Sequence, residues 1–170
     1  KYNFCLFLFS QFNNMNDLVA KFRGLLRYVQ VDFVRSAMDT MPWNVRLLGI
    51  RGPRGVGKTT LMLQHIKLFR SNQLAETLYV SLDSIWFQPG KLATLIDEFV
   101  AHGGRYLYLD EVHKYPNWAQ EVKNAYDAHL ELHIVFTGSS ALEILNSRAD
   151  LSRRAVVIDI QGFSFREFLN

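Results

Sequence analysis

The chain has 170 residues, the usual size of a single domain, and 49% of them are apolar, which predicts a hydrophobic core and argues against extensive disorder. The net charge of +3, from 19 basic and 16 acidic residues, is too small to favour a nucleic acid or a membrane surface as a partner. The single cysteine, Cys5, excludes an internal disulfide and favours a reducing, cytoplasmic setting.

Two segments precede the main domain. Residues 1–15 contain a short apolar run at 4–9, which is too short to span a bilayer and short for a signal peptide, so we expect no membrane association. We interpret residues 1–15 as a disordered or artificially added lead. Residues 16–42 have apolar residues at helical spacing from 16 to 38, and Pro42 forbids a simple continuation. This segment is predicted to be helical and to pack on the core, with its basic residues on the other faces: Lys21, Arg23, Arg27 and Arg35.

From residue 43 onward, apolar strands alternate with helices. Strands are predicted at residues 45–50, 78–82, 106–109, 132–137 and 155–160. One helix is predicted to follow a glycine-rich loop and to end at about residue 70. Further helices are predicted at residues 91–101, 117–130 and 141–146. This alternation predicts an α/β domain over residues 43–170, in which helices cover both faces of a parallel sheet. Because the last residues resemble an interrupted helix, we expect a further C-terminal domain in the full-length protein.

A glycine-rich loop, GPRGVGKT at residues 52–59, follows the first predicted strand of this domain. It matches the pattern G-x-x-x-x-G-K-[ST] at every fixed position and precedes a predicted helix. Without a Cβ at the glycines, the backbone can turn its N–H groups inward, and with the positive end of the helix these groups form a cradle for phosphate. The predicted nucleotide-binding residues are Gly52, Pro53, Arg54, Gly55, Val56, Gly57, Lys58, Thr59 and Thr60.

Two side chains of the loop have expected roles beyond the backbone cradle. Lys58 is expected to place its ammonium on the β- and γ-phosphates of a nucleotide, and the Thr59 hydroxyl is the expected Mg²⁺ ligand. The alternative is a glycine turn with a solvated lysine, which the complete motif disfavours.

Arg51 and Arg54 flank the loop. Either can reach a phosphate, although a solvated loop arginine is the simpler interpretation.

An acidic pair, Asp110 and Glu111, follows the apolar strand in RYLYLDEVH. A nucleotide with Mg²⁺ requires an acidic residue at the end of a neighbouring strand. We predict that Asp110 holds the metal and that Glu111 is the general base for the attacking water. The alternative is an acidic pair that merely ends a strand in solvent. The position of the pair, with one predicted strand between it and the glycine loop, favours the functional interpretation.

Polar residues also end the predicted strand 132–137. A side chain at this position, beside the strand of the glycine loop, can bond the γ-phosphate or the attacking water. Ser139 is the first candidate and Thr137 the second. The alternative is that Ser139 or Ser140 caps the following helix, and both interpretations can hold for different residues.

Arg153 and Arg154 directly precede the last predicted strand. In this arrangement neither lies near its own glycine loop, so either is a candidate arginine finger for the site of a neighbouring subunit. This interpretation implies a homo-oligomer of the full-length protein. The alternative is a pair of solvated arginines at the start of a strand.

Several blocks of the sequence together resemble the prokaryotic AAA-type ATP-binding proteins, in which a P-loop domain precedes a C-terminal domain of unknown function. The resemblance covers residues 16–170 and is carried by GPRGVGKTT, LYVSLD, LYLDEVHKYPNW, TGSSALEIL, ADLSRRAVV and GFSFREFLN. It implies a P-loop NTPase fold of the ASCE type, a three-layer α/β/α sandwich with a five-stranded parallel sheet in the order 5-1-4-3-2, and it implies ATP with Mg²⁺.

The resemblance also implies roles for individual residues. The residues that match the P-loop and hydrolysis positions are Gly52, Gly57, Lys58, Thr59, Asp110 and Glu111. Arg154 matches the arginine that precedes the last strand in the family. The lead 1–15 matches nothing in the family, and no lid domain is evident in the sequence.

The predicted function is Mg-dependent binding and hydrolysis of ATP, which drives a conformational change in a larger protein. A nucleotide-binding switch or scaffold with little hydrolysis is the alternative, and it does not need a carboxylate at Glu111. A small-molecule kinase is a third class, but such enzymes usually close an arginine-rich lid that is not found here. Whether the ATPase acts on a nucleic acid or on a protein is left open.

Overall fold

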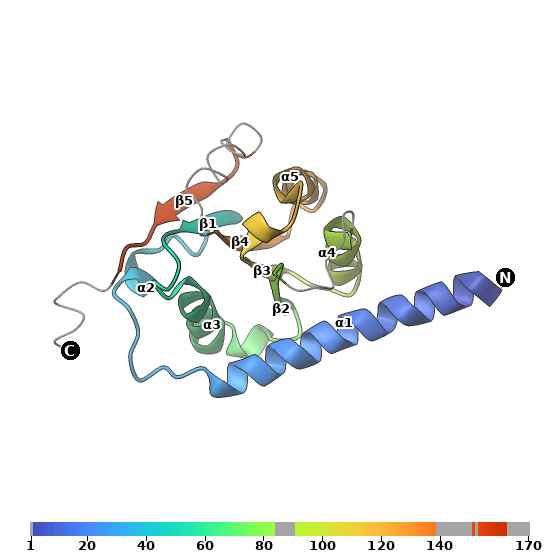
Figure 1. Cartoon of the computed structure of the whole chain (residues 1–170), viewed down its shortest axis with the longest axis horizontal. Coiled ribbons are helices and arrows are strands. Elements are labelled where there is room, and N and C mark those ends of the chain that lie inside the picture. Colours follow the sequence, from blue (N-terminus) through green and yellow to red (C-terminus); the bar gives the residue numbers. More distant parts are fainter. Residues whose placement is uncertain (1, 84–90, 139–150, 152, 163–170) are drawn as a thin grey trace.

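The computed structural model describes residues 2–83, 91–138, 151 and 153–162, with side chains from Met15 onward. Its centre is a sheet of five parallel strands in the order β2-β3-β4-β1-β5 (Figure 1). The strands are β1 (Leu47–Arg51), β2 (Thr77–Ser81), β3 (Tyr106–Asp110), β4 (His133–Gly138) and β5 (Val156–Asp159). This confirms the expected parallel sheet and the order 5-1-4-3-2. The predicted helix 141–146 lies outside the described residues.

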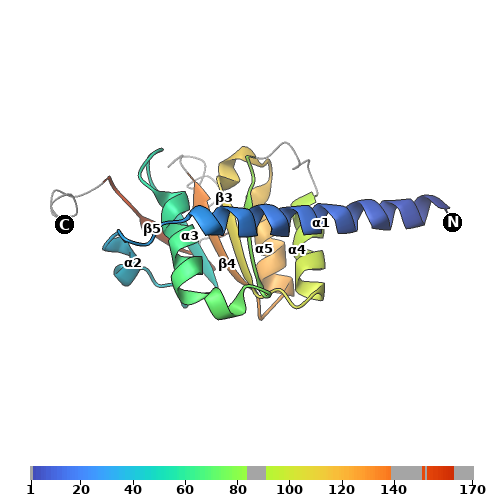
Figure 2. The ribbon, with the colours of Figure 1, turned by 90° about the horizontal axis from the view of Figure 1, so that it is seen from below.

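Helices cover both faces of the sheet, as Figures 1 and 2 show. One face carries α1 (Tyr2–Tyr28) and α3 (Lys58–Phe69), and the other carries α4 (Lys91–Ala101) and α5 (Trp118–Ala128). The short elements are α2 (Ala37–Thr40) and two 3₁₀ turns, η1 (Ser71–Gln73) and η2 (Val112–Lys114). Because both faces are covered, the central strands are apolar without alternation, and Leu48, Ile50, Leu107 and Leu109 are fully buried. The fold is therefore the predicted three-layer α/β/α sandwich.

Helix α1 differs from its predicted bounds at both ends. It begins at Tyr2 and ends at Tyr28, whereas the sequence predicted a helix over 16–38 and a disordered lead over 1–15. The helix packs on β2 through Phe22, whose ring lies 6.4 Å from the ring of Tyr79. Its N-terminal part projects past the sheet (Figure 2). The artificial origin of the lead and the division of the chain at residues 15 and 42 stay predictions.

The chain leaves the helix after Tyr28 because tertiary contacts hold the following residues in an irregular conformation. Gln64 Nε2 donates to the carbonyls of Gln30 (2.8 Å) and Phe33 (2.7 Å), and Lys67 Nζ donates to that of Val29 (2.6 Å). Two β-branched valines and an aspartate among residues 29–32 lower the helix propensity there. The bonds from α3 therefore satisfy carbonyls that a continued helix would otherwise use.

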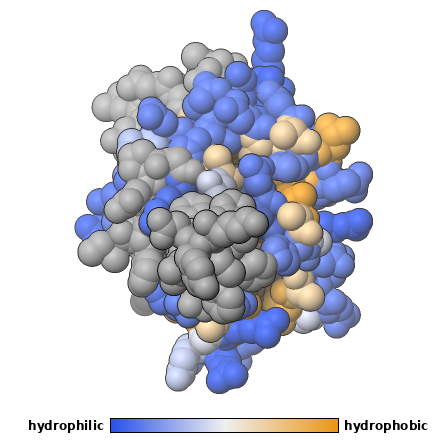
Figure 3. Space-filling view, turned by 90° about the vertical axis from the view of Figure 1, so that its right-hand side faces the viewer, coloured by the Kyte–Doolittle hydropathy of each residue, from blue (hydrophilic) through white to orange (hydrophobic). Residues whose placement is uncertain are grey.

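Hydrophilic residues cover most of the described surface on the side of the molecule seen in Figure 3. Within the described ranges, every helix is too short or too polar to cross a bilayer.

His65 of α3 is a titratable side chain buried in the core, with 3% of its surface exposed. Its ring stacks on Trp43 with 3.8 Å between ring centroids, and its Nδ1 lies 2.9 Å from the Tyr108 hydroxyl. Burial, with a smaller contribution from the charge of Arg70, lowers the pKa of His65 to about 3.

This pKa predicts a loss of stability in mild acid. The unfolded chain protonates His65 near pH 6.5, whereas the folded chain does so only near pH 3. The contribution of neutral His65 to the free energy of unfolding is therefore fully present above pH 6.5. It falls as the pH drops toward 3, by roughly 2 kcal/mol between pH 6.5 and 5. Urea unfolding at pH 7 and pH 5 measures this loss, which His65→Gln should reduce. His102→Gln, a change at an exposed histidine, is the control. Equal losses in the wild type and His65→Gln would contradict the assignment.

Candidate active site

The glycine loop lies between β1 and α3, as the sequence predicted. Gly55 and Gly57 have φ angles of +85° and +87°, a left-handed conformation that favours glycine. A Cβ at Gly52 would collide with the carbonyl oxygen of Ile160, which follows β5. Glycine is therefore favoured at Gly55 and Gly57 by the backbone conformation and at Gly52 by close packing. The N-terminus of α3, which starts at Lys58, adjoins the loop.

Lys58 is buried within the loop, with 4% of its surface exposed. Its Nζ donates to the carbonyls of Gly52 (2.8 Å) and Pro53 (2.9 Å). Burial lowers the pKa of Lys58, and the nearby charges of Glu111 and Asp110 oppose that shift. The ammonium is thus held by carbonyls of its own loop, beside the acidic pair.

Asp110, which is 3% exposed, is the centre of a hydrogen-bond network at the carboxyl end of β3. Its Oδ2 accepts from the Thr59 hydroxyl (2.6 Å) and the Tyr79 hydroxyl (2.9 Å). Its Oδ1 accepts from the Thr137 hydroxyl and from the backbone N–H of Glu111 (3.1 Å). Residues from α3, β2, β3 and β4 therefore meet at one carboxylate. Burial, then the charge of Asp110, raises the pKa of the Tyr79 phenol, which keeps it a donor.

Glu111 has an unusual backbone conformation, with φ at +54°. A left-handed conformation in a residue other than glycine costs on the order of 1–3 kcal/mol and is common at functional sites. The N–H of Glu111 also donates to Thr137 Oγ1 at 3.0 Å, so Thr137 contacts both residues of the acidic pair. The carboxylate of Glu111 is a quarter exposed, and its Oε2 lies 3.4 Å from His113 Nε2.

The structure brings together five of the predicted site residues: Lys58, Thr59, Asp110, Glu111 and Thr137. Among the remaining loop residues, Gly52 and Val56 are buried, Gly57 is half-buried, and Pro53, Arg54, Gly55 and Thr60 are exposed. Ser139 and Ser140 lie outside the described residues. The described ranges contain no cluster of three or more His, Cys, Asp or Glu side chains suited to a metal.

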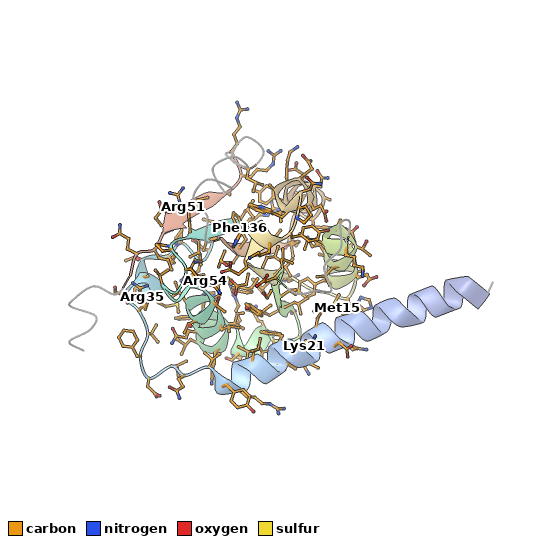
Figure 4. The ribbon with its side chains drawn as sticks, viewed as in Figure 1. Met15, Lys21, Arg35, Arg51, Arg54 and Phe136 are labelled. Carbon is orange, nitrogen blue, oxygen red and sulfur yellow. The ribbon has the colours of Figure 1, made fainter. Side chains whose placement is uncertain are left out.

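Two of the arginines considered in the sequence, Arg51 and Arg154, form ion pairs within the chain. Arg51 ends β1 and forms a two-bonded ion pair with Asp159 at the end of β5, so the interpretation as a solvated loop arginine was wrong (Figure 4). Arg154 donates from two nitrogens to Asp127 of α5, at 2.8 and 2.9 Å, and this pairing lowers the pKa of Asp127. Since Arg154 precedes β5 and the glycine loop follows β1 of the same parallel sheet, the two lie at opposite ends of the sheet.

Two residues of this region were missed from the sequence. Tyr79 lies in an apolar strand, and no local sequence pattern indicates that its hydroxyl contacts Asp110. Arg35 was predicted to lie on an outer face of a helix, but it is buried, and it donates to the carbonyls of Val56 (2.8 Å) and Gly162 (3.1 Å). The prediction failed because the helix ends at Tyr28, after which helical spacing no longer decides which residues face solvent.

A cavity of about 530 Å³ adjoins the start of α3. Thr60, Leu63 and Gln64 of α3 line one side, and the end of α1 with residues 29, 30, 32 and 33 lines the other. Since Thr60 directly follows the glycine-loop motif, the cavity lies next to the phosphate cradle.

The comparisons with known proteins agree with this geometry. A family model described as an AAA domain matches residues 44–169. The structure of PCH-2 from C. elegans has a TM-score of 0.50 at 20% identity, covering 89% of this chain and 42% of PCH-2. AMPPCP-bound DnaA from Aquifex aeolicus has a TM-score of 0.50 at 16% identity, covering 78% of this chain and 45% of DnaA. The chain thus spans less than half the length of either structure, and no curated protein matches it.

Proposed function

Because the chain belongs to the AAA domain family, we propose that it binds ATP with Mg²⁺ at the glycine loop and hydrolyses the β–γ phosphoanhydride bond. Hydrolysis would drive a conformational change in a larger protein. The observation that carries this proposal is the junction of Thr59, Asp110, Thr137 and the Glu111 backbone in one hydrogen-bond network beside Lys58. AMPPCP, bound to the structurally similar DnaA, supports a nucleotide as ligand.

The glycine loop supplies the phosphate contacts in this proposal. Backbone N–H groups of residues 55–59 and the positive end of α3 attract the phosphates. Lys58 exchanges its bonds to the Gly52 and Pro53 carbonyls for bonds to phosphate oxygens. The cavity beside Thr60 is the expected place for the nucleoside.

The donor set of the site fits magnesium. The Thr59 hydroxyl and the Asp110 carboxylate are oxygen ligands of the kind that Mg²⁺ prefers, and their hydrogen bond of 2.6 Å already holds them side by side. When bound, the ion would neutralise charge on the phosphates. The Tyr79 and Thr137 hydroxyls keep the Asp110 carboxylate oriented.

Glu111 is the proposed general base. Its carboxylate accepts a proton from water as that water attacks the γ-phosphate. Thr137 supports this role because its hydroxyl oxygen accepts the Glu111 N–H and fixes the backbone of the base. Ser139 is retained as a further candidate for contact with the γ-phosphate or the water.

Calorimetric titration tests the binding part of the proposal. ATP and ADP should bind in the presence of Mg²⁺, and removal of Mg²⁺ by a chelator should weaken ATP binding. No heat of binding for either nucleotide, under conditions where the chain is folded, would overturn the proposal.

A nucleotide-binding switch with little hydrolysis is the second candidate function. The observation that favours it is the contact between the Glu111 carboxylate and His113, because a carboxylate engaged with a neighbour is a weaker base. Binding without phosphate release would support the switch. We also propose a cytoplasmic location, which the lone cysteine supports.

We further propose that Arg154 acts as an arginine finger in a neighbouring subunit of a homo-oligomer. Its place at the end of the sheet opposite the glycine loop supports action in trans. Lys58→Ala subunits lose the lysine contact with phosphate, so their own hydrolysis should be low, but they still offer Arg154. Mixing them with Arg154→Ala subunits should therefore restore part of the ATPase activity, measured as phosphate release.

Asp127→Asn is the matched control for this experiment. It removes the partner of Arg154 within the same chain but keeps the arginine. If Arg154 serves only the ion pair, Asp127→Asn should lower activity as much as Arg154→Ala does. That result, or no recovery in mixtures shown to co-assemble, would overturn action in trans. Arg153 is tested in the same way.

A further inference from the structure

Arg35 connects three segments that are far apart in the sequence. It lies between α1 and α2, is 8% exposed, and donates from one guanidinium nitrogen to the carbonyl of Val56 in the glycine loop. A second nitrogen donates to the carbonyl of Gly162, beyond the end of β5. Figure 4 shows Arg35 on the same side of the domain as Arg54 of the glycine loop.

The bond to Val56 determines the direction of a phosphate-binding group. In a trans peptide the C=O and the following N–H point in opposite directions. A bond that holds the Val56 carbonyl therefore also sets the direction of the Gly57 N–H, on the other side of the same peptide plane. Arg35 thus acts on the phosphate cradle without contacting it.

This peptide needs an external restraint because of its neighbours. Rotation of the Val56–Gly57 peptide changes ψ of Val56 and φ of Gly57. Gly57 has a φ angle of +87°. Because glycine adopts both signs of φ readily, the Gly57 side of this rotation meets little steric resistance. A charge-assisted hydrogen bond from a buried guanidinium favours one orientation over the other.

We propose that Arg35 is a positioning residue for phosphate binding, which orients the Gly57 N–H toward the cradle and ties this peptide to the segment that follows β5. The inference rests on the proposed nucleotide binding at the glycine loop. It also predicts that phosphate binding and the position of residue 162 affect each other, since both depend on one guanidinium.

Arg46 is a matched control for Arg35. It also precedes β1, and it also donates to two backbone carbonyls, those of Tyr126 and His129, at 2.9 Å each. It lies at the amino end of β1, whereas the glycine loop follows the carboxyl end. Loss of Arg46 should therefore lower stability without changing the phosphate cradle.

The test measures ADP and ATP affinity by calorimetry for the wild type, Arg35→Ala, Arg35→Lys and Arg46→Ala, with thermal unfolding as a check on folding. Arg35→Ala should weaken ADP binding about tenfold or more, because one charge-assisted bond orients the cradle. Arg46→Ala should leave the affinity within about twofold. Millimolar guanidinium should restore part of the affinity of Arg35→Ala only.

A second measurement reports on Gly57 itself. Adding ADP should shift the backbone amide resonance of Gly57 strongly in the wild type and less in Arg35→Lys, which keeps the charge but not the two-bonded geometry. If Arg35→Ala does not fold, Arg35→Lys decides the question through affinity and this shift.

The outcomes separate this inference from the proposed function. If the wild type binds no nucleotide, the proposed function fails and the inference fails with it. If the wild type binds, but the Arg35 variants bind as tightly as Arg46→Ala and show the full Gly57 shift, Arg35 has only a structural role and the inference alone is overturned.

Discussion

Lys58→Ala is expected to lower the affinity for Mg–ATP by roughly 1.5–3 kcal/mol, which is about 10- to 150-fold. The change removes the charged contact with the β- and γ-phosphates, and alanine cannot replace it. Calorimetric titration of the folded variant measures the loss.

The structure adds a second consequence of this substitution. Lys58 donates to the Gly52 and Pro53 carbonyls, so the wild-type lysine must leave these partners to reach a phosphate. The measured loss of binding free energy is therefore the free energy of the lysine–phosphate contact minus that of the two carbonyl bonds that the lysine gives up. Lys123→Ala, which removes a lysine from α5 on the opposite face of the sheet, is the control and should bind as the wild type does (Figure 1). Equal affinities for the wild type and Lys58→Ala would refute the assignment of the loop.

Glu111→Gln is expected to retain nucleotide binding and to lower the rate of hydrolysis by about 10²- to 10⁴-fold, the usual contribution of a general base. The amide keeps the size and most of the packing of the carboxylate, but it cannot accept the proton of the attacking water. Single-turnover phosphate release at saturating ATP measures the rate, and calorimetry measures the affinity.

His113→Gln separates proton transfer from the local contact. His113 Nε2 lies 3.4 Å from the Glu111 carboxylate, and Glu111→Gln disturbs that contact as well. If the contact alone supports turnover, His113→Gln should be as slow as Glu111→Gln. We expect a much smaller effect from His113→Gln. Unchanged turnover in Glu111→Gln would contradict the role of Glu111 as general base and would favour a nucleotide-binding switch or a small-molecule kinase instead.

The parts of the site that could be predicted are those with local requirements. The glycines of the loop are needed where φ is positive or where a Cβ would collide, and each requirement concerns one position in the chain. The acidic pair follows an apolar strand directly, so its place at the end of β3 follows from the sequence. Ser139, the first candidate after the fourth strand, lies outside the described residues, whereas Thr137, the second, reaches both Asp110 and Glu111.

The order of the strands in the sheet could not be predicted from the alternation of strands and helices alone. Alternation predicts a parallel sheet, but β1 lies between β4 and β5, which are distant in the sequence. The order was expected from the resemblance to a family, not from periodicity. The structure confirms it through the pairing of Arg51 with Gly138 on one side and Asp159 on the other.

By itself, the sequence determined the glycine loop, the acidic pair and the covered parallel sheet, because each depends on residue types at fixed spacing. Only the tertiary structure decided the contacts of Arg35, Tyr79 and Arg51. Tyr79 meets Asp110 because β2 pairs with β3, and Arg51 meets Asp159 because β1 pairs with β5. Arg35 reaches the loop only because α1 ends at Tyr28 and the chain turns back toward β1. Such contacts depend on the path of the backbone between distant segments, and no local pattern of residues specifies that path.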